Sequence, residues 1–133
     1  HVSQMTEVAV YGAQSDIAQK KLPTPLPEGT FLYRIQGPIF FATIGRAFDQ
    51  YRFVHDHVDR VVIDLTEVPF IDMSGLVALR SMLASIVQEN RNVCVVCLHT
   101  AVSNRIRLKL KDYALVSNVG IYTTLEEALS DQD

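Results

Sequence analysis

Four consecutive residues, Asp72 to Gly75, include a carboxylate, a hydroxyl and a glycine, which are residue types that can bind a ligand or be modified. They stand between a predicted strand and a predicted helix. Asp72 is therefore expected to be the N-cap of that helix and to accept hydrogen bonds from the amides of Ser74 and Gly75. The hydroxyl of Ser74 would then lie beside backbone N–H groups that lack partners. Because free amides and the helix dipole favour negative charge, this turn suits a phosphate, either carried by Ser74 or brought by a ligand.

The same turn has a purely structural interpretation. Asp and Ser are ordinary residues at helix starts, so Ser74 can equally be a serine that only hydrogen-bonds the backbone of a capped turn. A hydrolase nucleophile at Ser74 is disfavoured, because no histidine base lies nearby in the sequence, no Gly-x-Ser-x-Gly elbow surrounds it and no glycine-rich phosphate loop is present. We therefore expect no catalytic role for Ser74.

The residues on either side of the turn show which elements must position it. Val61, Val62, Ile63 and Leu65 form a short apolar run that predicts a buried strand, and Pro69 ends it because proline lacks a backbone donor. After the turn, apolar residues recur at helical spacing to about residue 90 and predict an amphipathic helix. The turn is thus expected to join the carboxyl end of a buried strand to a helix.

Similar patterns recur along the chain. Further strands are expected near residues 30–36, 93–98 and 119–123, and further helices near 43–57, 101–116 and 124–129. Residues 8–11 are either a first edge strand or a tail, and residues 13–29, with three prolines, are expected to be an extended linker. The resulting order predicts an α/β fold, with a mostly parallel or mixed sheet of four to five strands and about four helices.

Length and composition are those of a single soluble domain. The chain has 133 residues, of which 48% are hydrophobic and 20% charged, and its formal net charge is −3. This charge argues against nucleic-acid binding, and no apolar run has the roughly 20 residues of a membrane span. We expect residues 28–130 to form the domain, residues 1–27 an N-terminal extension and residues 131–133 a tail. Because the chain begins with His1, it is expected to be a piece of a longer protein, and its own location cytosolic.

Two groups of residues invite a metal or redox interpretation that their context disfavours. Cys94 and Cys97 lie in a predicted strand, where positions three apart point to opposite faces, so they are expected to be reduced thiols that share no metal. His55, Asp56 and His57 lack a further clear ligand and are expected to be solvated. We expect no metal site.

The helix expected at residues 101–116 is the most basic part of the chain, with Arg105, Arg107, Lys109 and Lys111. Such a cluster is usually a solvated face. It is alternatively a surface for an anion or an acidic partner, because parallel strands present their carboxyl ends together and the start of this helix should lie near Ser74. Contact with anionic lipid headgroups is a further alternative that the sequence leaves open.

The segment from Val61 to Leu76 resembles the signature of the STAS domain, named for sulfate transporters and anti-sigma factor antagonists. The resemblance covers residues from about 28 to 130 and implies the STAS fold. In the anti-sigma factor antagonists this turn usually reads Asp-Ser-Ser-Gly, and a partner kinase phosphorylates the second serine. Ser74 occupies that second position and is the phosphorylation candidate, whereas Met73 replaces the first serine.

A second stretch distinguishes between the two branches of that family. The segment Gly37-Pro38-Ile39-Phe40-Phe41-Ala42 is similar to a corner that is typical of STAS domains in SulP-type anion transporters and unusual in the anti-sigma factor antagonists. The resemblance implies a non-catalytic regulatory domain on the cytoplasmic face of the inner membrane, within a bacterial transporter of sulfate, bicarbonate, dicarboxylate or a related anion. The alternative is a free-standing partner-switching protein, like the anti-sigma factor antagonists, that is phosphorylated on Ser74.

The resemblance also implies the partners and the surface that binds them. The expected partners are the membrane domain of the same transporter and an acidic cytosolic protein or a nucleotide, and a dimer could form through the parent transporter. No cofactor and no nucleic acid are expected. The candidate binding residues share one edge of the predicted sheet: Thr66, Asp72, Met73, Ser74, Gly75, Thr100, Asn104 and Arg105.

Overall fold

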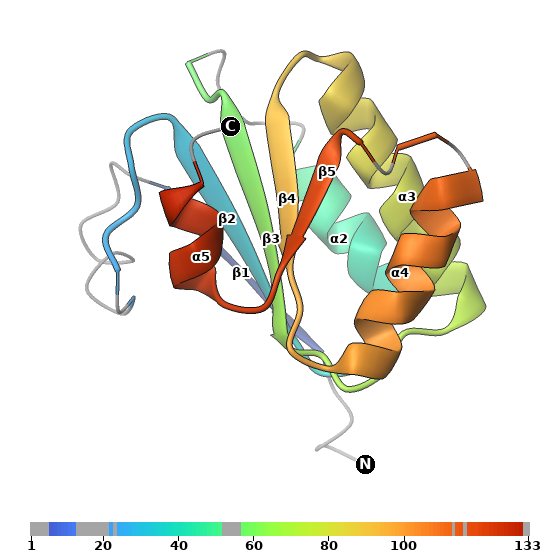
Figure 1. Cartoon of the computed structure of the whole chain (residues 1–133). Helices are drawn as coiled ribbons and strands as arrows, with labels where there is room; N and C mark the ends of the chain where they lie inside the picture. The colour runs from blue at the N-terminus through green and yellow to red at the C-terminus, as the bar shows by residue number, and fades with distance from the viewer. Residues whose placement is uncertain are drawn as a thin grey trace.

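The computed structural model describes residues 6–12, 22, 24–51, 57–112, 114, 115 and 117–131. This part of the chain forms one five-stranded sheet with four helices, which confirms the predicted α/β fold (Figure 1). The strands are β1 (Glu7–Gly12), β2 (Thr30–Gln36), β3 (Arg60–Glu67), β4 (Asn92–Val96) and β5 (Val119–Tyr122). The helices are α2 (Phe41–Tyr51), α3 (Met73–Gln88), α4 (Thr100–Asp112) and α5 (Leu125–Ser130).

The strands lie side by side in chain order, from β1 at one edge to β5 at the other. β2, β3, β4 and β5 run parallel, whereas β1 pairs antiparallel with β2. The sheet is therefore mixed, and the short apolar group near residues 8–11, which the sequence left open, is part of its edge strand. The predicted helix at residues 43–57 begins two residues earlier, at Phe41; residues 52–56 lie outside the described part.

Each face of the sheet has its own apolar core. Residues such as Val61, Ile63 and Leu65 point toward α2, α3 and α4, where most of the buried side chains lie. The alternate residue Val62 points to the opposite face, which α5 covers (Figure 1). Alternation along a strand separates the two cores, because successive side chains leave a sheet on opposite sides.

The two cysteines follow the same alternation. Cys94 packs in the core under α5 and Cys97 in the core under the three larger helices, and both are free thiols. Their side chains therefore lie on opposite faces of the sheet, as the predicted strand implied. Leu22 and Leu26, from the proline-rich segment, are buried in the core under α5, so this part of the expected linker packs on the sheet.

The parallel arrangement brings three helix starts to one edge of the sheet. The chain leaves β2, β3 and β4 at the bottom of Figure 1, and α2, α3 and α4 begin there. In parallel α/β sheets this carboxyl edge is the usual place for binding residues, because loops and helix N-termini converge on it. We call it the carboxyl edge.

Candidate functional site

The two sequence motifs that suggested a function are joined at the carboxyl edge. The backbone N–H of Ile39 donates to the carbonyl oxygen of Phe70 at 2.8 Å, and the N–H of Asp72 donates to the carbonyl oxygen of Ile39 at 3.1 Å. Ile39 and Ile71 form an isolated parallel bridge beyond the ends of their strands. The corner after β2 and the loop after β3 are therefore held together by their backbones.

Gly75 completes this junction. A Cβ atom at this position would lie 2.8 Å from the carbonyl oxygen of Ile39 and 2.9 Å from its Cγ2 atom. Contacts this short do not occur in folded proteins, and the first of the two groups is backbone that cannot rotate away. Gly75 thus lets the first turn of α3 pack directly on the corner that contains Ile39.

Asp72 caps α3 as the sequence predicted. Its backbone is extended, with φ −85° and ψ 176°, and its Oδ1 atom accepts a hydrogen bond from the N–H of Gly75 at 2.7 Å. The expected bond from the amide of Ser74 is replaced by one from its hydroxyl, at 2.9 Å to the same Oδ1 atom. Ser74 is nevertheless exposed, so its oxygen is open to a modifying enzyme or a partner.

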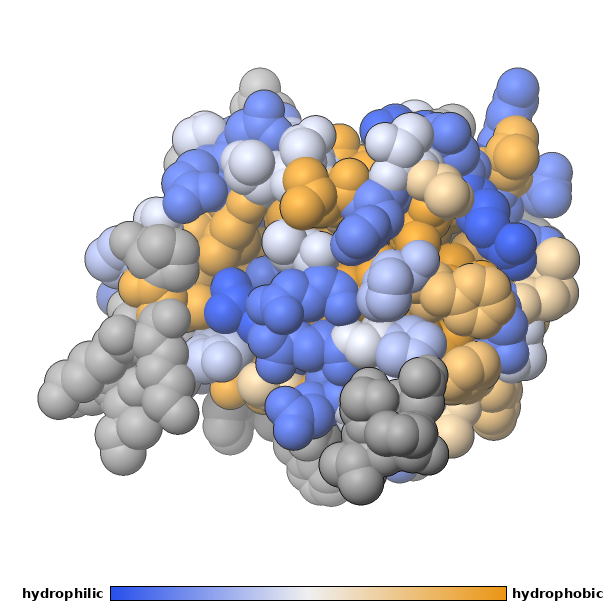
Figure 2. Space-filling model, turned by 90° about the horizontal axis from the view of Figure 1, so that it is seen from below, coloured by the Kyte–Doolittle hydropathy of each residue, from blue (hydrophilic) through white to orange (hydrophobic). Residues whose placement is uncertain are grey.

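Large hydrophobic side chains are exposed on the segments that adjoin the Ser74 turn. Phe41 is 63% exposed and Met73 is 58% exposed, and Phe40 and Phe70 are also exposed, with their ring centroids 6.2 Å apart. Figure 2 looks onto this edge and shows orange hydrophobic side chains at its right-hand side. We refer to Phe40, Phe41, Phe70 and Met73 as the aromatic edge. Exposed apolar residues gathered from several segments are typical of an interaction surface.

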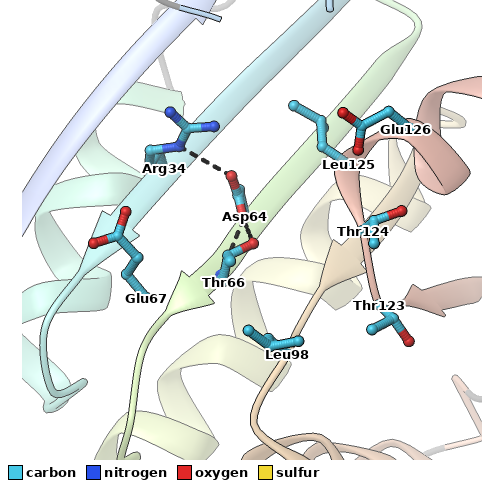
Figure 3. A pocket seen from close by; sticks show the side chains of 9 residues that line it. All are labelled: Arg34, Asp64, Thr66, Glu67, Leu98, Thr123, Thr124, Leu125 and Glu126. Carbon is cyan, nitrogen blue, oxygen red and sulfur yellow. Dashed lines mark hydrogen bonds and ion pairs between the residues drawn. The ribbon is translucent and has the colours of Figure 1, made fainter. Parts of the chain in front are cut away.

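Thr66 belongs to a different part of the site. It lies on the α5 side of the sheet and lines a cavity of about 330 Å³ between β2, β3 and the start of α5 (Figure 3). The lining residues are Arg34, Asp64, Thr66, Glu67, Leu98, Thr123, Thr124, Leu125 and Glu126. With three carboxylates and one guanidinium, this lining disfavours a phosphate, so a nucleotide phosphate is not expected beside Thr66.

A buried ion pair forms one wall of this cavity. Asp64, only 2% exposed, accepts a hydrogen bond from Nε of Arg34 at 3.0 Å. Its other oxygen accepts from the backbone N–H of Thr66 at 3.0 Å and from the Thr66 hydroxyl at 2.5 Å. Arg34 also lies over the ring of Tyr11, 5.7 Å from its centroid. Both carboxylate oxygens of Asp64 are thus paired, which offsets the cost of burying its charge.

The sequence reasoning missed Arg34 and Asp64, although one signal pointed to them. Asp64 interrupts an otherwise apolar strand, and Arg34 interrupts the neighbouring one. Only the register of the sheet, which places Arg34 directly beside Asp64, shows that the two charges meet.

The three remaining candidates lie at the start of α4. Thr100, Asn104 and Arg105 are exposed, and the neighbouring strands bring the start of α4 to the same edge as α3. Within the part of the chain that the structure describes, no hydrogen bond or ion pair joins Arg105 to Asp72 or Ser74. The topology places both helix starts at the same edge of the sheet.

Two further features bear on metal binding and on membrane crossing. Among the described residues, no group of three or more potential metal ligands is close enough to hold an ion, and His55 and Asp56 lie outside them. Within those same ranges, each helix is too short or too polar to cross a bilayer.

The sequence matches the STAS domain profile over residues 21–128, which is most of the chain. The chain belongs to the STAS domain family. Domains of this family are generally regulatory and not catalytic. A comparison with curated protein sequences found no significant match.

Solved structures with a similar fold come from both branches of the family. The STAS domain of a SulP transporter from Vibrio cholerae is 28% identical, with a TM-score of 0.64 over 85% of this chain and 87% of that one. An anti-sigma factor antagonist from Mycobacterium paratuberculosis is 21% identical, with a TM-score of 0.63 over 96% and 97% of the two chains. The murine Solute Carrier 26 family member A9 anion transporter is 18% identical, with a TM-score of 0.69 over 97% of this STAS domain and 22% of that protein. The last two likenesses concern the fold alone.

Proposed function

We propose that this STAS domain is the non-catalytic cytosolic regulatory domain of a SulP-type anion transporter, and that the aromatic edge binds the membrane domain of the same protein. The transported anion would be sulfate, bicarbonate, a dicarboxylate or a related species. The observation that carries the proposal is the exposure of Phe40 and Phe41 in a corner that resembles the SulP transporters. An aromatic pair that served only the core would be buried.

The junction at Ile39 gives the aromatic edge a fixed shape. Phe40 and Phe41 follow Ile39 directly, and Met73 precedes Gly75 by two residues, so both sides of the edge are anchored to one backbone contact. A preformed apolar surface loses little conformational entropy on binding, which favours docking. Met73 adds an unbranched, polarizable side chain that adapts to an irregular partner.

Ser74 is placed to regulate such docking. A phosphate on its hydroxyl would add about two negative charges next to the Asp72 carboxylate, directly beside the aromatic edge. Burying that charge in an apolar interface is unfavourable, so phosphorylation or an acidic substitution would weaken the contact. Thr100, Asn104 and Arg105 form the neighbouring surface, where an acidic cytosolic protein or a nucleotide would deliver a signal.

Membrane fractionation of the source cells tests the proposed function. An antibody raised against this domain should detect a protein much larger than 14.9 kDa that stays with the membranes after an alkaline wash. A small soluble product in the cytosolic fraction would contradict the transporter assignment, because an integral membrane protein resists this extraction.

The exposed hydroxyl of Ser74 also favours a second candidate function, a free-standing partner-switching protein. In that case a cognate kinase would phosphorylate Ser74, and the same antibody would detect the small soluble product. Phosphate-affinity electrophoresis of that product, with Ser74→Ala as the control, would then show whether the switch is used.

A further inference from the structure

Helix α4 has an exposed face that the proposed docking at the aromatic edge does not use. Its buried side is made by Val102, Ile106 and Leu110. Leu108 points the other way and is 66% exposed, the highest value among the large hydrophobic side chains of the described residues. Residues three apart on a helix are neighbours, so Arg105 and Lys111 lie one turn before and after Leu108.

Cations lie one turn before and one turn after this exposed leucine, and one exposed carboxylate, Asp112, also lies one turn after it. Arg105, Arg107 and Lys111 are exposed and Lys109 is half-buried. None of the four forms an ion pair or hydrogen bond with any carboxylate in the described ranges. We refer to Arg105, Arg107, Leu108 and Lys111 as the α4 face.

The charge around the α4 face is opposite to that of the whole protein. Helices α3 and α4 pack against each other on the right of Figure 1, and together they carry five basic residues and one acidic residue, Asp112. The complete chain nevertheless has a formal net charge of −3. These two helices therefore carry a net positive charge within a protein whose net charge is negative, and this creates a local positive potential.

We propose that the α4 face binds the anionic surface of a phospholipid membrane, with Leu108 entering the headgroup region and the cations contacting lipid phosphates. A helix with an apolar residue flanked by Lys and Arg is suited to lie at such an interface. Long cationic side chains can extend from the protein to the phosphates while their methylene groups stay near the apolar residue. The inference rests on the proposed function in one respect, since a transporter domain is held beside a membrane.

Vesicle flotation with the purified domain tests this proposal. The wild-type protein should float with vesicles of phosphatidylcholine mixed with phosphatidylglycerol, but not with phosphatidylcholine alone, and binding should fall as salt is raised. The double variant Arg107→Glu with Lys111→Glu should bind at least about tenfold more weakly, since each cation near an anionic surface contributes a factor of roughly five. Leu108→Gln should weaken binding by a smaller factor.

A matched pair of variants controls for net charge. Arg46→Glu changes the charge of the protein as much as Arg107→Glu does, and Arg46 is likewise exposed on a helix, α2. Only Arg107→Glu should reduce flotation. Equal losses with the two variants would overturn the proposal, as would flotation that is insensitive to salt. The proposal would also be overturned if the wild-type protein floated with neither kind of vesicle. That result would favour an acidic protein as the binding partner of the α4 face.

A third arm separates this inference from the proposed docking. The variant Phe41→Ser with Met73→Ser alters the aromatic edge and should float as well as the wild type. Loss of flotation in this variant, with the α4 variants unaffected, would move the lipid contact to the aromatic edge and refute the α4 assignment. Because the fractionation experiment uses the parent protein and no vesicles, its outcome does not depend on this one.

Discussion

The carbonyl oxygen of Ile39 lies 2.8 Å from the place where a Cβ atom on Gly75 would be. This contact joins the aromatic corner after β2, which carries Phe40 and Phe41, to the first turn of α3, which carries Met73 and Ser74. The geometry of the candidate site therefore depends on a glycine at position 75.

Gly75→Ala should destabilise the domain by about 1–3 kcal/mol, because the added methyl group overpacks a contact with rigid backbone. The matched control is Gly45→Ala in α2, where an added Cβ meets no atom within 4 Å. That substitution should stabilise the protein by about 0.5–1 kcal/mol, since alanine favours the helix. Urea unfolding of both variants measures the difference, and equal effects would show that the Ile39 contact is not tight.

Asp64→Ala should cost about 2–4 kcal/mol of unfolding free energy. It removes the acceptor for Arg34 Nε and for both donors of Thr66, and it leaves a largely buried guanidinium without its counter-ion. Glu126→Gln, on the exposed rim of the same cavity, should change the stability by about 0.5 kcal/mol or less. Comparable losses of unfolding free energy in the two variants would mean that the buried Arg34–Asp64 pair stabilises the fold no more than an exposed carboxylate does.

Asp72→Ala should cost about 1 kcal/mol, the usual effect of losing an N-cap. Ser74→Ala should cost much less, because its exposed hydroxyl only donates to a carboxylate that still caps Gly75. Thermal unfolding of the two variants decides between a structural and a functional role for the serine. A loss with Ser74→Ala as large as with Asp72→Ala would favour the purely structural interpretation of the turn.

Burial raises the pKa of the Cys94 thiol from 9.0 to about 11. The folded state then holds this proton more tightly than the unfolded state, so its contribution to stability is intact below pH 9 and is lost as the pH rises toward 11. The stability advantage of the wild type over Cys94→Ala should shrink by about 2–3 kcal/mol across this range. Native Cys94 should also react slowly with thiol reagents at pH 8. An advantage that is constant with pH would contradict the burial of this thiol.

Much of the fold could be predicted because the sequence patterns are strong. The run from Val61 to Leu65 is short, rich in β-branched residues and followed by Pro69, which indicates a strand, and the spacing of apolar residues after Ser74 has the helical period. The start of α5 is determined equally locally, because the side chains of Thr124 and Glu127 each accept a hydrogen bond from the other residue's backbone N–H. The sequence did not decide whether residues 8–11 form an edge strand or a tail, because four apolar residues do not reveal the strand with which they pair.

The site was less predictable, because it depends on which face each side chain occupies. Thr66 was expected beside Ser74, but it follows Asp64 by two positions and therefore points to the α5 side of the sheet. The exposure of Phe40 and Phe41 could not be derived from residue type either, since phenylalanine usually indicates a core position. Both features follow from packing between distant segments.

Site-specific photo-crosslinking in the parent protein tests the central claim most directly. A benzophenone amino acid replaces Phe41 at the aromatic edge or, as the control, exposed Ser117 in the turn before β5. After illumination of native membranes, mass spectrometry identifies the linked peptides. We predict that the Phe41 position links to cytosolic loops of the membrane domain, that Ser117 does not, and that Ser74→Glu reduces the Phe41 product. Docking of the aromatic edge on the membrane domain would be contradicted if positions 41 and 117 gave equal amounts of crosslinked product, or if position 41 linked only to a soluble protein.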